Sequence, residues 1–98
     1  MRKQTLAHIL PLGSIVTLKQ GTKKVMIIGR CQKNQATGID YDYSSCYYPE
    51  GVLNPQELFL FQQEDIDKVY YIGMQDGEEF AFRDFMEQQL TSMGMLED

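Results

Sequence analysis

Apolar residues in the first three quarters of the chain form short runs separated by glycine, proline and polar residues. This pattern is typical of β-strands joined by turns. It predicts strands at 14–19 and 24–30, with a hairpin turn around Gly21 between them. Four consecutive apolar residues at 25–28 favour a central strand covered on both faces. Strict alternation predicts a third strand at 39–43, continuing or resuming at 46–48, and two apolar runs predict strands at 58–61 and 69–73.

After Asp76 the apolar period changes to that of a helix, which we expect to span 77–93. Asp76 is a suitable N-cap, with Glu79 in the capping-box position, and Gly94 is suitable just past the helix end. The helix has one apolar stripe, formed by Phe82, Phe85, Met86, Leu90 and Met93. The stripe either packs on the sheet or its open end, or remains available to a groove or another helix.

Five short strands followed by one helix predict the α+β class. We expect a small curled antiparallel sheet or an SH3-like barrel of about five strands, with a C-terminal amphipathic helix. The 98 residues are enough for a single domain. It would consist of an N-terminal arm at 1–11, a β-rich body at 12–74 and the helix at 76–94.

The N-terminus begins with basic residues, as a signal peptide does. Its apolar run is short, however, and is interrupted by His8, Pro11 and Gly13. No stretch approaches the length of a membrane span. Cys31 and Cys46 form no motif, and free thiols in a reducing compartment are expected, although the spacing also permits a disulfide. We therefore expect a cytoplasmic protein that does not cross a membrane.

Net charge is −5, but it is unevenly distributed. Residues 1–33 carry basic groups and no acid, whereas all fourteen acids lie in residues 34–98. Either neighbouring strands pair these charges with each other, or the acidic C-terminal half docks on a basic partner.

No sequence motif indicates catalysis, and we expect neither an enzyme nor a bound cofactor or metal. His8 is the only histidine and has no nucleophile beside it, and the two cysteines lack zinc-site spacing. Asp40 and Asp42 share a strand face and could hold a cation, but a solvated polar face explains them as simply. Basic residues such as Lys24 could contact nucleic acid, which the acidic pI of about 4.7 disfavours.

Protein binding is the function class that remains. Tyrosines crowd the middle of the chain and either build the core or anchor an interface. Tyr47 and Tyr48 are adjacent, so they point to opposite faces if the strand continues. Arg30 either pairs with an acid such as Asp40 or Asp42, or serves as an anchor. The candidate protein-binding residues are Arg30, Tyr41, Tyr43, Tyr47, Tyr48, Glu50, Phe82 and Phe85.

Five segments together resemble a family of small Gram-positive bacterial proteins of unknown function. The segments lie at 10–16, 21–30, 41–43, 48–52 and 61–66. Members of that family are often encoded beside LXG toxins of the type VII (ESX-like) secretion system. The resemblance implies a cytoplasmic adaptor or chaperone, whose partner is such a toxin or a secretion component. The alternative is an immunity-like or regulatory protein that inhibits a toxin or binds nucleic acid.

Overall fold

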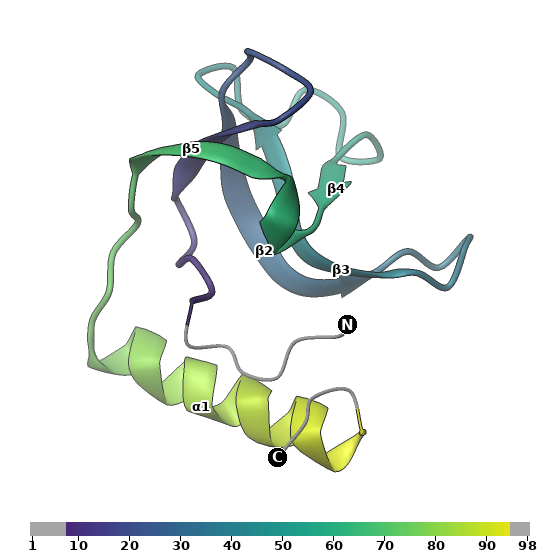
Figure 1. The fold of residues 1–98 in the computed structure, drawn as a ribbon, viewed down its shortest axis with the longest axis vertical. Helices are drawn as coiled ribbons and strands as arrows, with labels where there is room; N and C mark the ends of the chain where they lie inside the picture. The colour runs from purple at the N-terminus through teal and green to yellow at the C-terminus, as the bar shows by residue number, and fades with distance from the viewer. Residues whose placement is uncertain (1–7, 95–98) are drawn as a thin grey trace.

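The computed structural model describes residues 8–94 of the chain. It contains five strands, a 3₁₀ turn and one helix: β1 (Ile15–Leu18), β2 (Val25–Lys33), β3 (Asp40–Tyr47), β4 (Phe59–Phe61), η1 (Gln63–Asp65), β5 (Ile66–Tyr71) and α1 (Gly77–Ser92). The strands form one antiparallel sheet in the order β4-β3-β2-β1-β5, so the predicted α+β class and the central position of β2 are confirmed. Within residues 8–94 this sheet is curled but not closed into a barrel (Figure 1).

Curling begins in the long strand β2. Its pairing with β3 shifts register between Ile27 and Gly29, which is the mark of a β-bulge. A side chain at Gly29 would collide with the Ser44 hydroxyl, so glycine allows β3 to approach β2 closely here. The bent strands then carry β4 and β5 to opposite edges of the sheet.

The edge strand β5 contains two irregularities against β1. One register shift leaves Tyr70 as an extra residue, and the other leaves Asp67 as an extra residue. Bulges twist an edge strand and interrupt the regular row of backbone groups that it presents. All residues of β5 after Ile66 are exposed.

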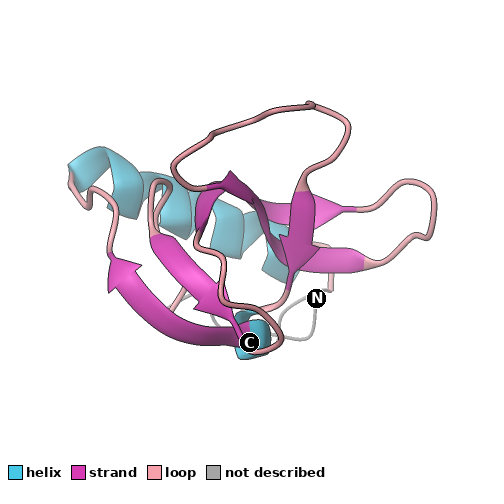
Figure 2. Ribbon diagram, turned by 90° about the horizontal axis from the view of Figure 1, so that it is seen from above, coloured by secondary structure: helices cyan, strands magenta, loops and turns pink. Residues whose placement is uncertain are grey.

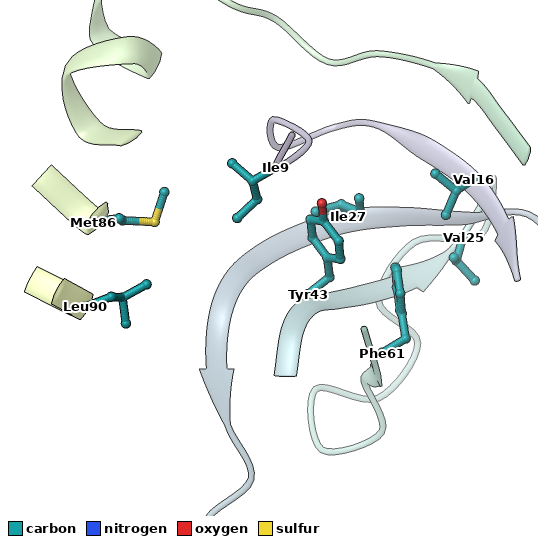
Figure 3. Close-up of a cluster of buried hydrophobic side chains, with 8 residues drawn as sticks. All are labelled: Ile9, Val16, Val25, Ile27, Tyr43, Phe61, Met86 and Leu90. Atoms are coloured by element: carbon teal, nitrogen blue, oxygen red, sulfur yellow. The ribbon is translucent and has the colours of Figure 1, made fainter. Parts of the chain in front are cut away.

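The core joins the sheet to the helix through the N-terminal segment (Figure 3). Ile9 lies between the helix residues Met86 and Leu90 and the sheet residues Ile27 and Tyr43. Pro11 is also fully buried. Residues 9–11 therefore belong to the core rather than to a loose arm, while residues 1–7 of the predicted arm lie outside the described residues.

Helix α1 begins and ends as predicted, but its apolar stripe is only partly buried. Met86 and Leu90 are buried, whereas Phe82, Phe85 and Met93 are exposed, so the interpretation of the whole stripe as core is wrong. The helix meets the body along a narrow line, in which Arg83 and Glu79 occupy the positions one turn and two turns before Met86. The Asp76 side chain accepts a hydrogen bond from the Glu79 backbone at 2.9 Å and caps the helix.

Gly73 fixes the point where the chain leaves the sheet for the helix. It is buried, and its N–H donates to the Ser14 hydroxyl at 3.0 Å. A Cβ at Gly73 would collide with the carbonyl oxygen of Leu12. The extended segment that follows leads to α1 (green, left in Figure 1), and Figure 2 shows the helix lying beyond the curled strands.

Candidate functional site

Aromatic side chains from β5 and from the turn after β3 come together at the β5 edge of the sheet. The residues Ile15, Lys24, Tyr48, Tyr70 and Tyr71 line one open groove, which we call the tyrosine surface. Ile15 of β1 pairs with Tyr71 of β5, and the Tyr48 N–H donates to the Lys24 carbonyl at 3.0 Å. These backbone bonds fix the positions of β1, β5 and the β1–β2 hairpin around the groove.

The tyrosines of this surface are unusually open to solvent. Tyr48, Tyr70 and Tyr71 are 40%, 52% and 59% exposed. Since a tyrosine side chain presents on the order of 200 Å² when fully accessible, the three rings expose roughly 300 Å². That value is in the range of the largest apolar patch on a typical monomer, and such patches are often functional.

Lysines give the tyrosine surface a positive edge. The Lys24 ammonium lies 4.9 Å from the centroid of the Tyr70 ring, within cation–π range. Lys23 beside it forms an ion pair with Glu50 at 2.7 Å, and the hydrogen bond from Lys23 lowers the pKa of Glu50. Both members of that pair are well exposed, so it contributes little to stability.

Arg30 is buried in an ion pair with the helix. Its guanidinium donates to both carboxylate oxygens of Glu79, at 2.5 and 2.8 Å, and Arg83 donates to the same carboxylate at 2.9 Å. Of the two alternatives for Arg30, the structure shows an intramolecular partner, but that partner is Glu79 rather than Asp40 or Asp42, because the fold brings α1 to its guanidinium. Glu79 is therefore used to attach α1 to the sheet, and Arg30 is inaccessible as an interface anchor in this conformation.

Tyr43 is wholly buried and belongs to the core. Its hydroxyl accepts a hydrogen bond from the Leu10 N–H at 2.9 Å and donates to the Gln63 side-chain oxygen. Burial raises the pKa of Tyr43 to about 12. Tyr43 thus joins the N-terminal segment, β3 and η1, and it presents no surface to a partner.

Asp42 is buried as well, which corrects the prediction of a solvated polar face. Its carboxylate accepts a hydrogen bond from the Gln63 N–H at 2.7 Å, and its own N–H donates to the Gln62 side chain at 3.2 Å. The Gln62 amide in turn donates to the Asp40 carbonyl at 2.8 Å. These bonds fasten η1 to β3, which is a structural role.

The remaining predicted tyrosines have intermediate positions. Tyr41 is half-buried in β3, opposite Gln32. Tyr47 is half-buried with its ring 4.6 Å from that of Phe59, so it packs beneath the 51–58 loop. Of the adjacent pair it is Tyr48 that is exposed; β3 ends at Tyr47, so Tyr48 stands in the turn rather than on the opposite face of a continued strand.

Phe82 and Phe85 lie together on one exposed flank of α1. Their rings stack with centroids 6.2 Å apart, and the Arg30 guanidinium lies 5.8 Å from the Phe82 ring centroid. They belong to the helix and are not part of the tyrosine surface. Phe80 lies on the other flank, where it contacts Arg83.

Sequence reasoning missed Ile15, Lys24, Tyr70 and Tyr71. The run 69–72 has the composition of a strand, and composition alone does not distinguish a core strand from an edge strand. The available signal was its place as the last strand before the helix, next to the charged pair Asp67 and Lys68.

Other kinds of site receive no support from the described residues. Among them, no group of three His, Cys, Asp or Glu side chains is placed to hold a metal ion. Cys31 and Cys46 are free thiols, and burial raises the pKa of Cys31, which makes it a poor nucleophile at neutral pH. In the part of the chain from 8 to 94, no helix is long and apolar enough to cross a membrane.

Comparison with known proteins gives one match. A family model described as "Domain of unknown function (DUF4176)" matches residues 9–82. This span includes the whole sheet and the start of α1. No curated protein and no solved structure matches the chain.

Proposed function

The chain belongs to the DUF4176 family, and we propose that it is a non-catalytic accessory factor that binds another protein through the tyrosine surface. The observation that carries the proposal is the gathering of Tyr48, Tyr70 and Tyr71, all exposed, around one groove. Tyrosine is a favoured interface anchor because it buries a large area with few rotamers to fix. A surface of this kind can bind another protein without any catalytic group.

Side chains rather than strand addition would provide the contact. An added strand needs a regular row of free N–H and C=O groups along the edge. The bulges at Asp67 and Tyr70 interrupt that row on β5. The partner therefore lays a segment across the tyrosine rings, and apolar burial supplies most of its affinity.

The partner we propose is a type VII-secreted LXG toxin. This part of the proposal rests on the resemblance of the five sequence segments described above. As an adaptor or chaperone in the cytoplasm, the domain would shield an apolar segment of the toxin before export. Lys24 at the edge of the groove favours a segment that also carries a carboxylate.

The test is co-purification of the tagged chain with the neighbouring LXG toxin, expressed as separate N-terminal and toxic domains. A stoichiometric complex with the N-terminal domain supports the adaptor. A complex with the toxic domain that abolishes toxicity supports an immunity-like inhibitor instead. The absence of any complex at micromolar concentration and low salt contradicts the proposal.

A matched pair of variants then locates the binding surface. Tyr70→Ser removes a central exposed ring, whereas Leu53→Ser removes an even more exposed apolar side chain from the 51–58 loop. Loss of an interface anchor typically weakens binding about tenfold or more. We expect this loss for Tyr70→Ser and wild-type affinity for Leu53→Ser. Equal affinities would place the interface elsewhere.

A further inference from the structure

The molecule has a second exposed aromatic surface, on α1, and its charge is opposite to that of the tyrosine surface. Phe82 and Phe85 are each about half exposed. Glu78 lies one turn before Phe82 and two turns before Phe85, so the three residues share one flank of the helix. We call Glu78, Phe82 and Phe85 the helix strip.

The two surfaces carry opposite charges beside their aromatic rings. The tyrosine surface has Lys24 at its edge; the hairpin segment 19–24 that carries it has three lysines and no acid, and one of them, Lys23, is paired with Glu50. Helix α1 has four acids and one arginine. Two stacked phenylalanines next to a carboxylate are therefore complementary to three tyrosines next to an ammonium group.

We propose that, while no partner is bound, the helix strip of one copy docks on the tyrosine surface of a second copy. This inference rests on the proposed function, since it describes the regulation of that same surface. Pairing of two α1 helices with each other is the competing arrangement, and it would bring two Glu78 carboxylates and two acidic helices together. Charge thus favours the contact between helix strip and tyrosine surface.

In the two-fold pair that we propose, each copy would contribute both of its surfaces at once. Phe82 and Phe85 are each about half exposed and Glu78 is exposed as well, so the strip presents roughly 250 Å² to a partner. Two reciprocal contacts give roughly 500 Å² per copy, less than the roughly 800 Å² that a stable interface buries on each side. An interface of this size is typical of a weak, transient complex, and we expect its dissociation constant to lie between about 10 µM and about 1 mM.

A low affinity suits the role of this contact. The second copy shields the tyrosines from non-specific association and still yields to a partner with a larger interface. A partner that binds more tightly would dissociate the pair into complexes that each contain one copy of the chain.

Sedimentation equilibrium of the full chain tests the proposal from about 10 µM to about 1 mM, a range that spans the expected constant. We expect a monomer at the low end and a dimer that builds up toward the high end. Phe85→Ser should weaken the dimer about tenfold, whereas Phe80→Ser is the matched control on the opposite flank and should leave it unchanged. Monomers at every concentration, or equal effects of the two variants, would overturn the proposal.

A charge exchange identifies the contact itself. Lys24→Glu alone, or Glu78→Lys alone, should weaken the dimer about fivefold, and the double exchange should restore it within about twofold. Additive loss in the double variant contradicts the arrangement. All four positions that are changed, at residues 24, 78, 80 and 85, are exposed, so the variants should fold.

The pairing of two copies and the capture of a toxin can be tested independently of each other. Capture of the toxin is measured at about 1 µM, where the chain is monomeric whether or not it self-associates. A monomer that binds the toxin refutes only the pairing, and a dimer that ignores the toxin refutes only the proposed function.

Discussion

The attachment of α1 to the sheet depends on the buried ion pair of Arg30 and Glu79, and three variants test it. The two side chains are only 3% and 10% exposed. Removal of one member of such a pair leaves an uncompensated buried charge and typically costs 3–5 kcal/mol. For Glu79→Leu we expect about 3 kcal/mol, at the lower end, because the Leu10 carbonyl still accepts a hydrogen bond from Arg30.

The other two variants distinguish the free-energy cost of an unpaired buried charge from the cost of lost packing. Arg30→Met should cost only about 1–2 kcal/mol, because Glu79 keeps its bond to Arg83. In the double variant Arg30→Met with Glu79→Leu, the central pair is replaced by apolar groups and only Arg83 loses its carboxylate partner, so stability should return to within about 1–2 kcal/mol of wild type. Urea or guanidinium unfolding gives the free energies, and for Glu79→Leu thermal unfolding should shift by roughly 15 °C.

Acid titration gives an independent check on the same pair. The hydrogen bond from Arg30 is the main cause of the lowered pKa of Glu79, which burial partly opposes. The folded pKa lies below the unfolded value of 4.5, so the contribution of the pair is present above pH 4.5 and is lost as the pH falls through the folded pKa. In the Glu79→Leu variant, the free energy of unfolding should lack this part of its dependence on pH. A Glu79→Leu protein as stable as wild type, or a double variant as unstable as the single one, would refute the reasoning.

Three further predictions concern the core and the exit from the sheet. Stability should decline as the pH rises from 10 towards 12, because the folded pKa of Tyr43 is about 12 and exceeds the unfolded value; Tyr43→Phe should lose this slope in unfolding curves at pH 9, 10 and 11. Gly73→Ala should cost more than about 2 kcal/mol in denaturant unfolding, because its Cβ collides with the Leu12 backbone, and a cost below about 0.5 kcal/mol would contradict the close approach. Leu90→Ala should cost about 2–3 kcal/mol and lower the helical signal in circular dichroism, whereas an unchanged signal and stability would mean that α1 is not anchored there.

The sequence pattern predicted the structure correctly where the residues that determine it lie close together in the chain. The turn at Gly21 and the apolar run at 25–28 predicted a hairpin leading into the central strand, and the structure confirms both. Asp76 and Gly94 predicted the ends of α1 because capping depends on residues within one turn.

Side-chain contacts between residues far apart in the chain could not be predicted in the same way. The Arg30 guanidinium finds its carboxylate 49 positions along the chain, on an element that the local pattern does not place next to β2. Alternation predicted that Asp42 faces solvent, but the Gln63 backbone of η1 covers it. Such pairs depend on how the sheet curls, and the curl depends on bulges at β2 and β5; Gly29 inside the β2 run marks the first, and the residues of β5 do not mark the second.

The candidate site was predicted only in part, for the same reason. Tyr48 was among four candidate tyrosines in the middle of the chain, but the pattern did not distinguish it from Tyr43, which is buried, or from Tyr47, which is half-buried. Tyr70 and Tyr71 were missed because their exposure follows from the place of β5 at the edge of the sheet, beside β1, which lies some fifty residues earlier in the chain.

The decisive experiment is titration of a purified LXG toxin fragment into the wild-type chain, Tyr70→Ser and Leu53→Ser. We expect a one-to-one complex for wild type and Leu53→Ser, and a loss of affinity of about tenfold or more for Tyr70→Ser with its stability unchanged. Equal affinity of all three proteins would show that the tyrosine surface is not the binding site.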